Sequence, residues 1–336
     1  MTAGVLKIRR IKAEAACFSI GCVVYYAVDS KQERHLNMAA PAPISYYVEF
    51  QTLNDQTRPV YLHELAVHGA KNIVLTSPLI RMIMDTPAFL KTVQQELAAE
   101  GLKFCDVHAP YAVPYDLNCP FEELRPFLTA RFRTSMELAA SLGLDTMTFH
   151  TGHDGADPEI PREKHIERVC SMLDQLLPDA ERLGITLCIE NGMSQNNSTD
   201  VLLTVRDHFD SDHLGFCFDA GHGNLMEKGI AFPGSSPRIQ WKKIGQEPKW
   251  ESVQEKMNRM LPHIVNCHLH DNLGEWDQHT LPGHGTVDWK LVTGMLKKAP
   301  RLRAIQCEAL SIRNGFSVAE LVRTMEHLFD QPEEEK

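Results

Sequence analysis

From Ser45 onward, short apolar runs alternate with longer segments in which apolar residues recur every three or four positions. The short runs, rich in β-branched and aromatic residues, predict buried strands, and the longer segments predict amphipathic helices. Eight strands are expected: Ser45–Phe50, Asn72–Leu75, Lys103–His108, Asp145–His150, Thr186–Glu190, Leu214–Asp219, Ile264–His268 and Ala304–Glu308. Because helical segments separate the strands, the pattern predicts an α/β fold with a parallel sheet, and eight units favour a (β/α)8 TIM barrel.

Helix-end signals agree with this alternation. Gly143 and Gly184 follow the helices expected at 121–142 and 162–183, where glycine tolerates a left-handed helix end. Ser317 and Glu320 form the spacing of a capping box at the start of the last helix. A doubly wound open sheet is the alternative fold, but the glycine-rich phosphate loop of its dinucleotide-binding versions does not follow the first predicted strand.

One connection is unusually long. About thirty residues separate Asp219 from the helix expected near Trp250, and they include a Pro-Gly-Ser-Ser-Pro stretch and Trp241. Long loops in compact domains often serve as lids or binding loops, and a solvated insertion is the other interpretation. On the first interpretation, Trp241 is a candidate substrate-binding residue.

The first residues do not follow the barrel pattern. Basic residues precede the apolar stretch Ala15–Val28, as in a signal peptide, but Glu14 stands at its start and no clear small-residue cleavage site follows. We therefore predict that residues 1–40 form an N-terminal extension outside the barrel, or that synthesis starts at Met38. Residues 41–336 are predicted to form the barrel.

The charge and the cysteine content limit the partners and the cellular compartment that we expect. The formal net charge is −10 and no long Lys/Arg run occurs, which speaks against nucleic acid as a partner. The nine cysteines are scattered without a C-x-x-C pair, which favours a reduced, cytoplasmic protein. The apolar stretch near the N-terminus is too short and too mixed for a membrane span, so no membrane association is expected.

Potential metal ligands stand at the ends of successive predicted strands. Strands three to eight end in His108, His150, Glu190, Asp219, His268 and Glu308. In a barrel these ends meet at the face that carries the active site. Burying so many carboxylates costs several kcal/mol per ion unless a cation compensates them. Oxygen and imidazole ligands therefore predict a divalent metal, and Mn²⁺, Mg²⁺, Co²⁺ and Zn²⁺ all remain open.

Several motifs at these strand ends resemble the xylose isomerase-like TIM-barrel superfamily, which includes sugar isomerases and epimerases and the AP endonuclease family 2. The similarity runs from about Ser45 to the last helix. Its strongest parts are Glu190-Asn, Phe-Asp219-Ala-Gly-His222, His268-Leu-His-Asp-Asn and the run from Asp277 to Trp289.

The isomerase and epimerase branch implies one main metal held by Glu190, Asp219, His268 and Glu308. His222 would lie beside the substrate, and His108 is a further candidate contact. The chemistry needs two acid/base groups at adjacent carbons of a hydroxy-carbonyl sugar, while the metal stabilises an enediolate. Glu190 and Glu308 fit those two roles.

The nuclease branch implies a larger cluster with three zinc ions. Compatible residues stand at all nine of its positions, which adds His108, His150, His222, Asp277 and His279 to the four ligands above. Such a cluster would activate water against a phosphodiester of damaged DNA. Ligand identity alone therefore leaves an AP endonuclease-like phosphodiesterase as the alternative function.

Other residues favour small carbohydrate chemistry. The run Thr280–Trp289 is similar to the sugar-enzyme version, and Gln278 stands where the nuclease branch usually has arginine. His284 departs from the sugar branch, which commonly has glutamate there. A metal-dependent isomerase or epimerase is thus the preferred prediction, and a non-catalytic metal or sugar sensor is the third. The sequence leaves open which sugar is bound, whether it is phosphorylated, how many metal ions bind and whether the chain forms a homo-oligomer.

Overall fold

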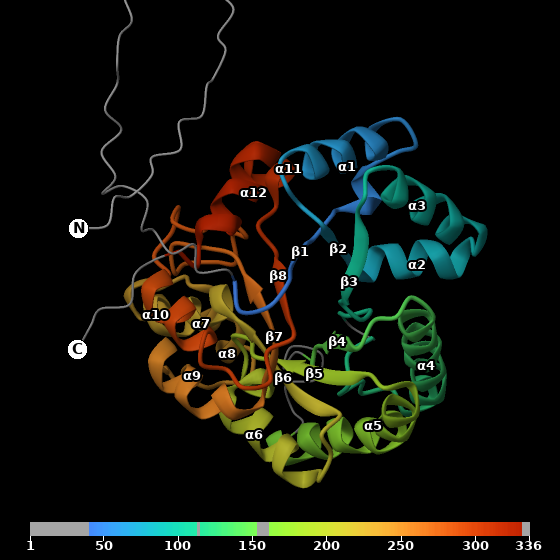
Figure 1. Cartoon of the computed structure of the whole chain (residues 1–336). Coiled ribbons are helices and arrows are strands. Elements are labelled where there is room, and N and C mark those ends of the chain that lie inside the picture. Colours follow the sequence, from blue (N-terminus) through green and yellow to red (C-terminus); the bar gives the residue numbers. More distant parts are fainter. Residues whose placement is uncertain (1–39, 113–114, 153–160, 331–336) are drawn as a thin grey trace, which may run out of the picture. The chain divides into compact units, whose positions relative to one another are not determined.

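Eight parallel strands form the centre of the computed structural model, which describes residues 40–112, 115–152 and 161–330. The strands are β1 Ile44–Tyr46, β2 Asn72–Leu75, β3 Lys103–Val107, β4 Thr146–Phe149, β5 Thr186–Glu190, β6 Leu214–Asp219, β7 Ile264–Leu269 and β8 Ala304–Cys307. They pair in the order β3-β2-β1-β8-β7-β6-β5-β4. A parallel bridge between His108 and Thr148 joins the two ends, so the sheet curls into a barrel and the predicted fold class is confirmed (Figure 1).

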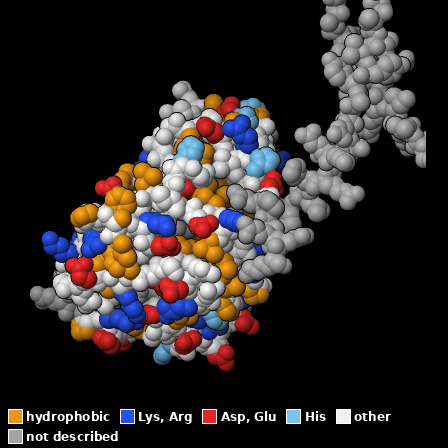
Figure 2. Space-filling view, turned by 90° about the vertical axis from the view of Figure 1, so that its left-hand side faces the viewer, with side chains coloured by type: hydrophobic (Ala, Val, Ile, Leu, Met, Phe, Trp, Pro, Cys, Tyr) orange, Lys and Arg blue, Asp and Glu red, His pale blue; other side chains and the backbone are white. Residues whose placement is uncertain are grey.

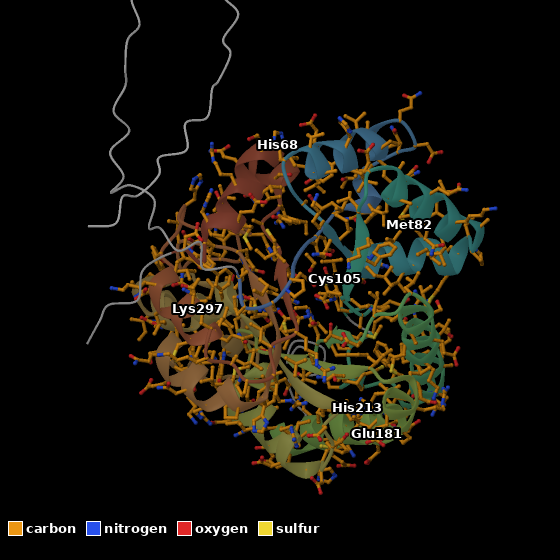
Figure 3. All side chains as sticks on the ribbon, viewed as in Figure 1. His68, Met82, Cys105, Glu181, His213 and Lys297 are labelled. Carbon is orange, nitrogen blue, oxygen red and sulfur yellow. The ribbon has the colours of Figure 1, made fainter. Side chains whose placement is uncertain are left out.

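Helices cover the outside of the strands (Figure 1). They are α1 Thr57–Val67, α2 Ser77–Asp85, α3 Ala88–Ala99, α4 Arg125–Ser141, α5 Arg162–Leu183, α6 Thr199–His208, α7 Ala220–Lys228, α8 Ser236–Lys242, α9 Val253–Met260, α10 Trp289–Leu296, α11 Ser311–Asn314 and α12 Val318–His327. Glu181 on α5 and Lys297 at the end of α10 lie in this outer ring (Figure 3). The predicted caps are confirmed: Gly184 ends α5 at φ 71°, and Ser317 with Glu320 forms the capping box of α12.

Strands β3, β4, β7 and β8 differ from the predicted boundaries by one residue at one or both ends, and two larger differences occur elsewhere. β1 is shorter than Ser45–Phe50, because the chain leaves the sheet after Tyr46 and turns into the 3-10 helix Phe50–Thr52. The connection after β6 is not one long loop, because α7, the 3-10 turn Gly229–Ala231 and α8 occupy most of it.

A polar layer lies inside the barrel, just below the ends of the strands. The Asn266 amide donates to both carboxylate oxygens of Asp106 at 2.9 Å and to Thr148 Oγ1 at 3.1 Å. Thr146 Oγ1 also donates to Asp106. Side chains alternate along a strand, so residues two positions beyond this layer also point toward the barrel axis. In β7 that residue is His268, and after β3 it is His108.

The predicted extension, residues 1–40, lies outside the described residues except for Ala40. All seven described cysteines are free. Within the described ranges, no helix combines the length and apolar character that crossing a bilayer requires. On the face shown in Figure 2, acidic, basic and apolar side chains are interspersed.

Candidate metal centre

Asp219 links the sheet to the cluster of histidines and carboxylates at the barrel rim. It is the last residue of β6 and the N-cap of α7, where its Oδ1 accepts from the backbone N–H of His222 at 2.6 Å. This cap fixes the carboxylate orientation. Its other oxygen, Oδ2, lies 3.1 Å from His270 Nε2 and 3.8 Å from His268 Nδ1. One helix cap therefore directs a carboxylate oxygen at two imidazoles.

His268 lies at the centre of the cluster and is fully buried. Its Nδ1 is 3.3 Å from Glu190 Oε1 and 3.4 Å from Glu308 Oε1. Together with Asp219, the two glutamates surround this imidazole: Glu190 ends β5, Asp219 ends β6 and Glu308 directly follows β8. This is the four-residue set that the isomerase branch implies for its main metal.

Two histidines extend the cluster on the β3–β4 side. Glu190 Oε2 is 3.0 Å from His150 Nε2 and 3.9 Å from His108 Nε2. Tyr111 lies over both rings, with centroid distances of 4.6 Å to His150 and 4.9 Å to His108. Glu190 is thus shared between these histidines and His268.

Asp277 contacts the histidines on the other side of the cluster. Its Oδ2 lies 3.0 Å from His279 Nε2 and 3.4 Å from His222 Nε2, and its Oδ1 lies 3.8 Å from His270 Nε2. The rings of His270 and His279 stack at 4.0 Å. His279 has a left-handed backbone with φ 51°, a conformation that is costly for a side chain-bearing residue and needs support from its surroundings.

Backbone carbonyls orient three of the histidine rings. The Nδ1 atoms of His108, His222 and His279 lie 2.9–3.0 Å from the carbonyl oxygens of Ala109, Asn191 and Glu308 respectively. An Nδ1–H that donates to a carbonyl leaves Nε2 as the free ligand atom, the arrangement common in protein metal sites. In each case Nε2 points at a carboxylate of the cluster.

The mutual contacts shift the pKa values of the cluster strongly. Burial opposes ionisation of Glu190, but the charges of His268 and His150 outweigh it and hold the pKa of this carboxyl well below its usual range. Burial also opposes protonation of His268, but Glu308 and Glu190 raise its pKa to about 10. For His279, Asp277 outweighs burial and raises the pKa to about 9. Burial and the neighbouring His150 instead lower the pKa of His108 to about 4.

Several ligand atoms of the cluster have no hydrogen-bond partner among the described residues. They include both ring nitrogens of His268, Oε2 of Glu190 and Oδ1 of Asp277, and all are buried. Buried polar atoms are normally paired, since leaving one unpaired costs roughly 1–3 kcal/mol. Glu190, Asp219 and His268 offer ligand atoms within 4.8 Å of one another, as do three-residue sets around His108 and Asp277. The residues present therefore fit one or more divalent cations.

The structure gathers the predicted ligands at one rim: His108, His150, Glu190, Asp219, His222, His268, Asp277, His279 and Glu308. It also adds His270, which sequence reasoning did not include among the ligands. The signal was present, because positions 268 and 270 share one face of a strand. Trp241 does not join the group: it is buried, and its indole N–H donates to the Met193 carbonyl at 3.0 Å.

A pocket of about 300 Å³ opens over the cluster. Its lining includes seven cluster residues, namely His108, His150, Glu190, His222, Asp277, His279 and Glu308. The remaining lining residues are Tyr47, Glu49, Gln51, Tyr111, Leu310 and Arg313. The pocket is thus lined mainly by polar side chains and is large enough for a small polyhydroxylated molecule.

The eight-stranded barrel and the histidines and carboxylates at its rim together define a class of protein. A comparison with family models identifies the same class. The model of the family described as xylose isomerase-like TIM barrel matches residues 63–323, and the chain belongs to this family. A solved D-tagatose 3-epimerase-like protein shares the fold with a TM-score of 0.59 and 19% identity, covering 85% of this chain and 95% of that one.

Two curated proteins are also similar to this chain in sequence. An uncharacterized protein of Methanocaldococcus jannaschii is 25% identical over 240 residues, covering 68% of this chain and 72% of the relative. A probable endonuclease 4 of Citrifermentans bemidjiense is 26% identical over 145 residues, covering 41% of this chain and 48% of the relative.

Proposed function

We propose that this protein is a metal-dependent isomerase or epimerase of a sugar or sugar-like hydroxy-carbonyl compound. The observation that carries the proposal is the placement of Glu190 and Glu308, whose carboxylates approach the same His268 nitrogen at 3.3 and 3.4 Å. Both also line the pocket. Two carboxylates on either side of one ligand position suit a reaction that moves a proton between neighbouring positions of a bound sugar.

In the proposed site, Glu190, Asp219, His268 and Glu308 would hold the main cation. A divalent metal at that position would polarise the substrate oxygens and stabilise the negative charge that develops on them when a proton leaves carbon. Glu190 remains ionised near neutral pH, because its pKa lies well below the usual range, and it can accept that proton. Glu308 in its carboxylic acid form would then donate a proton to the neighbouring carbon or to the opposite face of the same carbon, which replaces the proton taken by Glu190.

The walls of the pocket suit a carbohydrate. His108 and His222 lie within it and can contact substrate oxygens through Nε2 where no second cation occupies them. Tyr47, Glu49 and Gln51 add a phenol, a carboxylate and a carboxamide, which together donate to and accept from hydroxyl groups. A small carbohydrate is therefore the proposed partner, and the D-tagatose 3-epimerase-like relative supports the same substrate class.

The test is hydrogen exchange at carbon. Metal-loaded protein is incubated with a panel of ketoses and aldoses in D₂O, and NMR records deuterium entering the substrate. Glu190→Gln and Glu308→Gln should each slow exchange by roughly 10²–10⁴-fold. The exposed Glu137 on α4 provides the control, because Glu137→Gln removes a carboxylate far from the pocket lining. Full exchange by either pocket variant would rule out the two-glutamate mechanism.

A zinc phosphodiesterase that acts on damaged DNA is the second candidate. The gathering of all nine ligands expected for a three-zinc cluster favours it, as does the match to a probable endonuclease 4. Metal analysis separates the two: one tightly bound ion per chain supports the sugar reaction, and three support the nuclease. Protein loaded with three zinc ions that leaves an abasic-site duplex uncut at high enzyme concentration would eliminate the nuclease.

A further inference from the structure

The pocket has a wall that takes no part in the metal cluster. It is built from the residues that follow β1 and β8 together with the loop after β3: Tyr47, Glu49, Gln51, Tyr111, Leu310 and Arg313. Arg313 is the only Lys or Arg side chain among the described lining residues. The lining residues outside this wall are all carboxylates and imidazoles of the cluster, so this guanidinium gives the wall a different chemical character.

Arg313 lies on α11, a single helical turn that is anchored at both ends. Ser311 Oγ and the Tyr61 hydroxyl share a hydrogen bond of 2.7 Å. At the other end, the Asn314 amide donates to the carbonyl oxygens of Gln278 at 3.1 Å and His279 at 2.8 Å. These bonds attach α11 to the same loop that supplies His279 to the cluster. The fold therefore fixes the backbone of α11 beside the pocket, and the Arg313 side chain extends from it exposed to solvent.

The guanidinium of Arg313 has no carboxylate within 4.0 Å among the described residues. Other arginines differ: Arg58 binds Glu96 at 2.6 Å, and Arg133 binds Asp179 at 2.6 Å. An unpaired guanidinium offers five N–H donors in a planar fork that matches a carboxylate or a phosphate. Arg313 thus presents this fork at the pocket without a protein anion to occupy it.

We propose that Arg313 forms an anion subsite and that the substrate carries a phosphate or carboxylate group at the end away from the metal. This inference rests on the proposed function, because it assumes that the pocket takes a sugar-like molecule. The metal compensates the cluster carboxylates, and Glu49 repels anions from its part of the lining. Arg313 is then the cationic side chain left for that group among the described lining residues outside the cluster, so charge directs the group to it. The neutral part of the sugar then extends toward Tyr47, Gln51 and the cluster.

Direct binding to the metal-loaded full-length protein tests the subsite without requiring turnover. Calorimetry compares D-fructose 6-phosphate, D-glucuronate and neutral D-fructose. At least one anionic probe should bind about tenfold or more tightly than D-fructose, a difference of about 1.4 kcal/mol. The probe that shows this preference distinguishes a phosphate from a carboxylate.

Substitutions of Arg313 test whether its guanidinium causes the preference for the anionic probe. Arg313→Gln should abolish the preference for the anion, and Arg313→Lys should retain part of it, because the charge remains but the fork is lost. Arg323→Gln on the exposed face of α12 is the matched control and should change nothing. Higher salt should weaken binding of the anionic probe only.

Two outcomes overturn the subsite: equal binding of all probes or none, and a preference that survives in Arg313→Gln. Failure of the proposed function shows separately, as absence of deuterium exchange in every sugar despite Arg313-dependent anion binding. Conversely, exchange of an anionic sugar by Arg313→Gln with the same rate and affinity as by the unaltered protein would support the reaction and remove the subsite.

Discussion

A Cβ atom added at Gly221 would lie 2.0 Å from Cε1 of His270. Gly221 is in the first turn of α7, two residues after Asp219, and the imidazole of His270 packs against its bare backbone. This approach holds Nε2 of His270 at 3.1 Å from Asp219 Oδ2. The helix after β6 thus contributes to the cluster through the absence of a side chain.

Gly221→Ala should therefore damage the metal centre. The new methyl group would displace the His270 ring, and we expect metal affinity to fall by about 10–100-fold, as for loss of a supporting contact. Gly223→Ala on the same helix is the control, because its Cβ would meet Phe218 at an ordinary 3.5 Å. Isothermal titration with metal compares the two, and equal affinities would show that His270 takes no part.

His268→Ala should lower the number of metal ions bound per chain, since this buried imidazole contacts Glu190, Asp219 and Glu308. The variant leaves buried carboxylates without a counter-charge, so the metal-free protein should also lose about 3–5 kcal/mol of stability. Elemental analysis and chemical denaturation measure the two effects. His68→Ala, which removes a half-exposed histidine at the end of α1, is expected to leave both unchanged.

Stability and metal binding should depend on pH in opposite directions above neutrality. The pKa of His268 is raised from 6.5 to about 10, so its contribution to the metal-free protein is complete below pH 6.5 and is lost as the pH rises toward 10. The pKa of Glu190 is lowered, so its contribution is present above its usual value of 4.5 and is lost as the pH falls further. The metal-free protein should be most stable between these limits, at about pH 5–6.5.

A metal replaces the proton on His268, so binding at pH 7–8 should release protons and affinity should rise with pH toward 10. Thermal denaturation with a chelator, and calorimetry in buffers of different ionisation enthalpy, measure the two effects. Proton-free metal binding at pH 7 would contradict the assignment of protonated histidines.

Asp271→Ala should destabilise the fold more than it affects the metal ligands directly. Its carboxylate accepts from the N–H groups of Gly283 at 2.9 Å and Val287 at 3.1 Å and from the Trp289 indole at 2.8 Å. Removing the acceptor leaves donors unpaired at roughly 1–3 kcal/mol each. Asp288→Ala removes only the cap of α10, for about 1 kcal/mol. Urea denaturation should rank the two in that order.

Much of the candidate site could be predicted because it depends on local rules. Strand alternation places every second residue toward the barrel axis, and parallel strands bring their carboxyl ends to one rim. Glu190, Asp219 and His268 therefore converge whatever the details of the loops. The same rule applied one step further would have included His270, which repeats the orientation of His268.

The directions of side chains in the segments that connect the strands could not be predicted by such a rule. The direction of Trp241 depends on how α8 packs, and the structure turns its indole to the Met193 carbonyl instead of the pocket. Asp271 adjoins His270 in sequence but points the other way and holds the loop that ends at Trp289. These directions are decided by partners distant in the sequence.

The sequence by itself determined the eight strand–helix units, the ligands at the strand ends and the family they resemble. The reason is that the alternation typical of strands and the spacing typical of helices can be recognised among neighbouring residues. Only the tertiary structure decided that His270 packs on Gly221, that α11 binds the His279 loop and that Arg313 reaches the pocket unpaired. Those relationships join segments that are distant in the sequence, by 250 residues for the Tyr61–Ser311 bond that anchors α11. They arise when packing and hydrogen bonding choose among many side-chain directions that the local sequence allows equally.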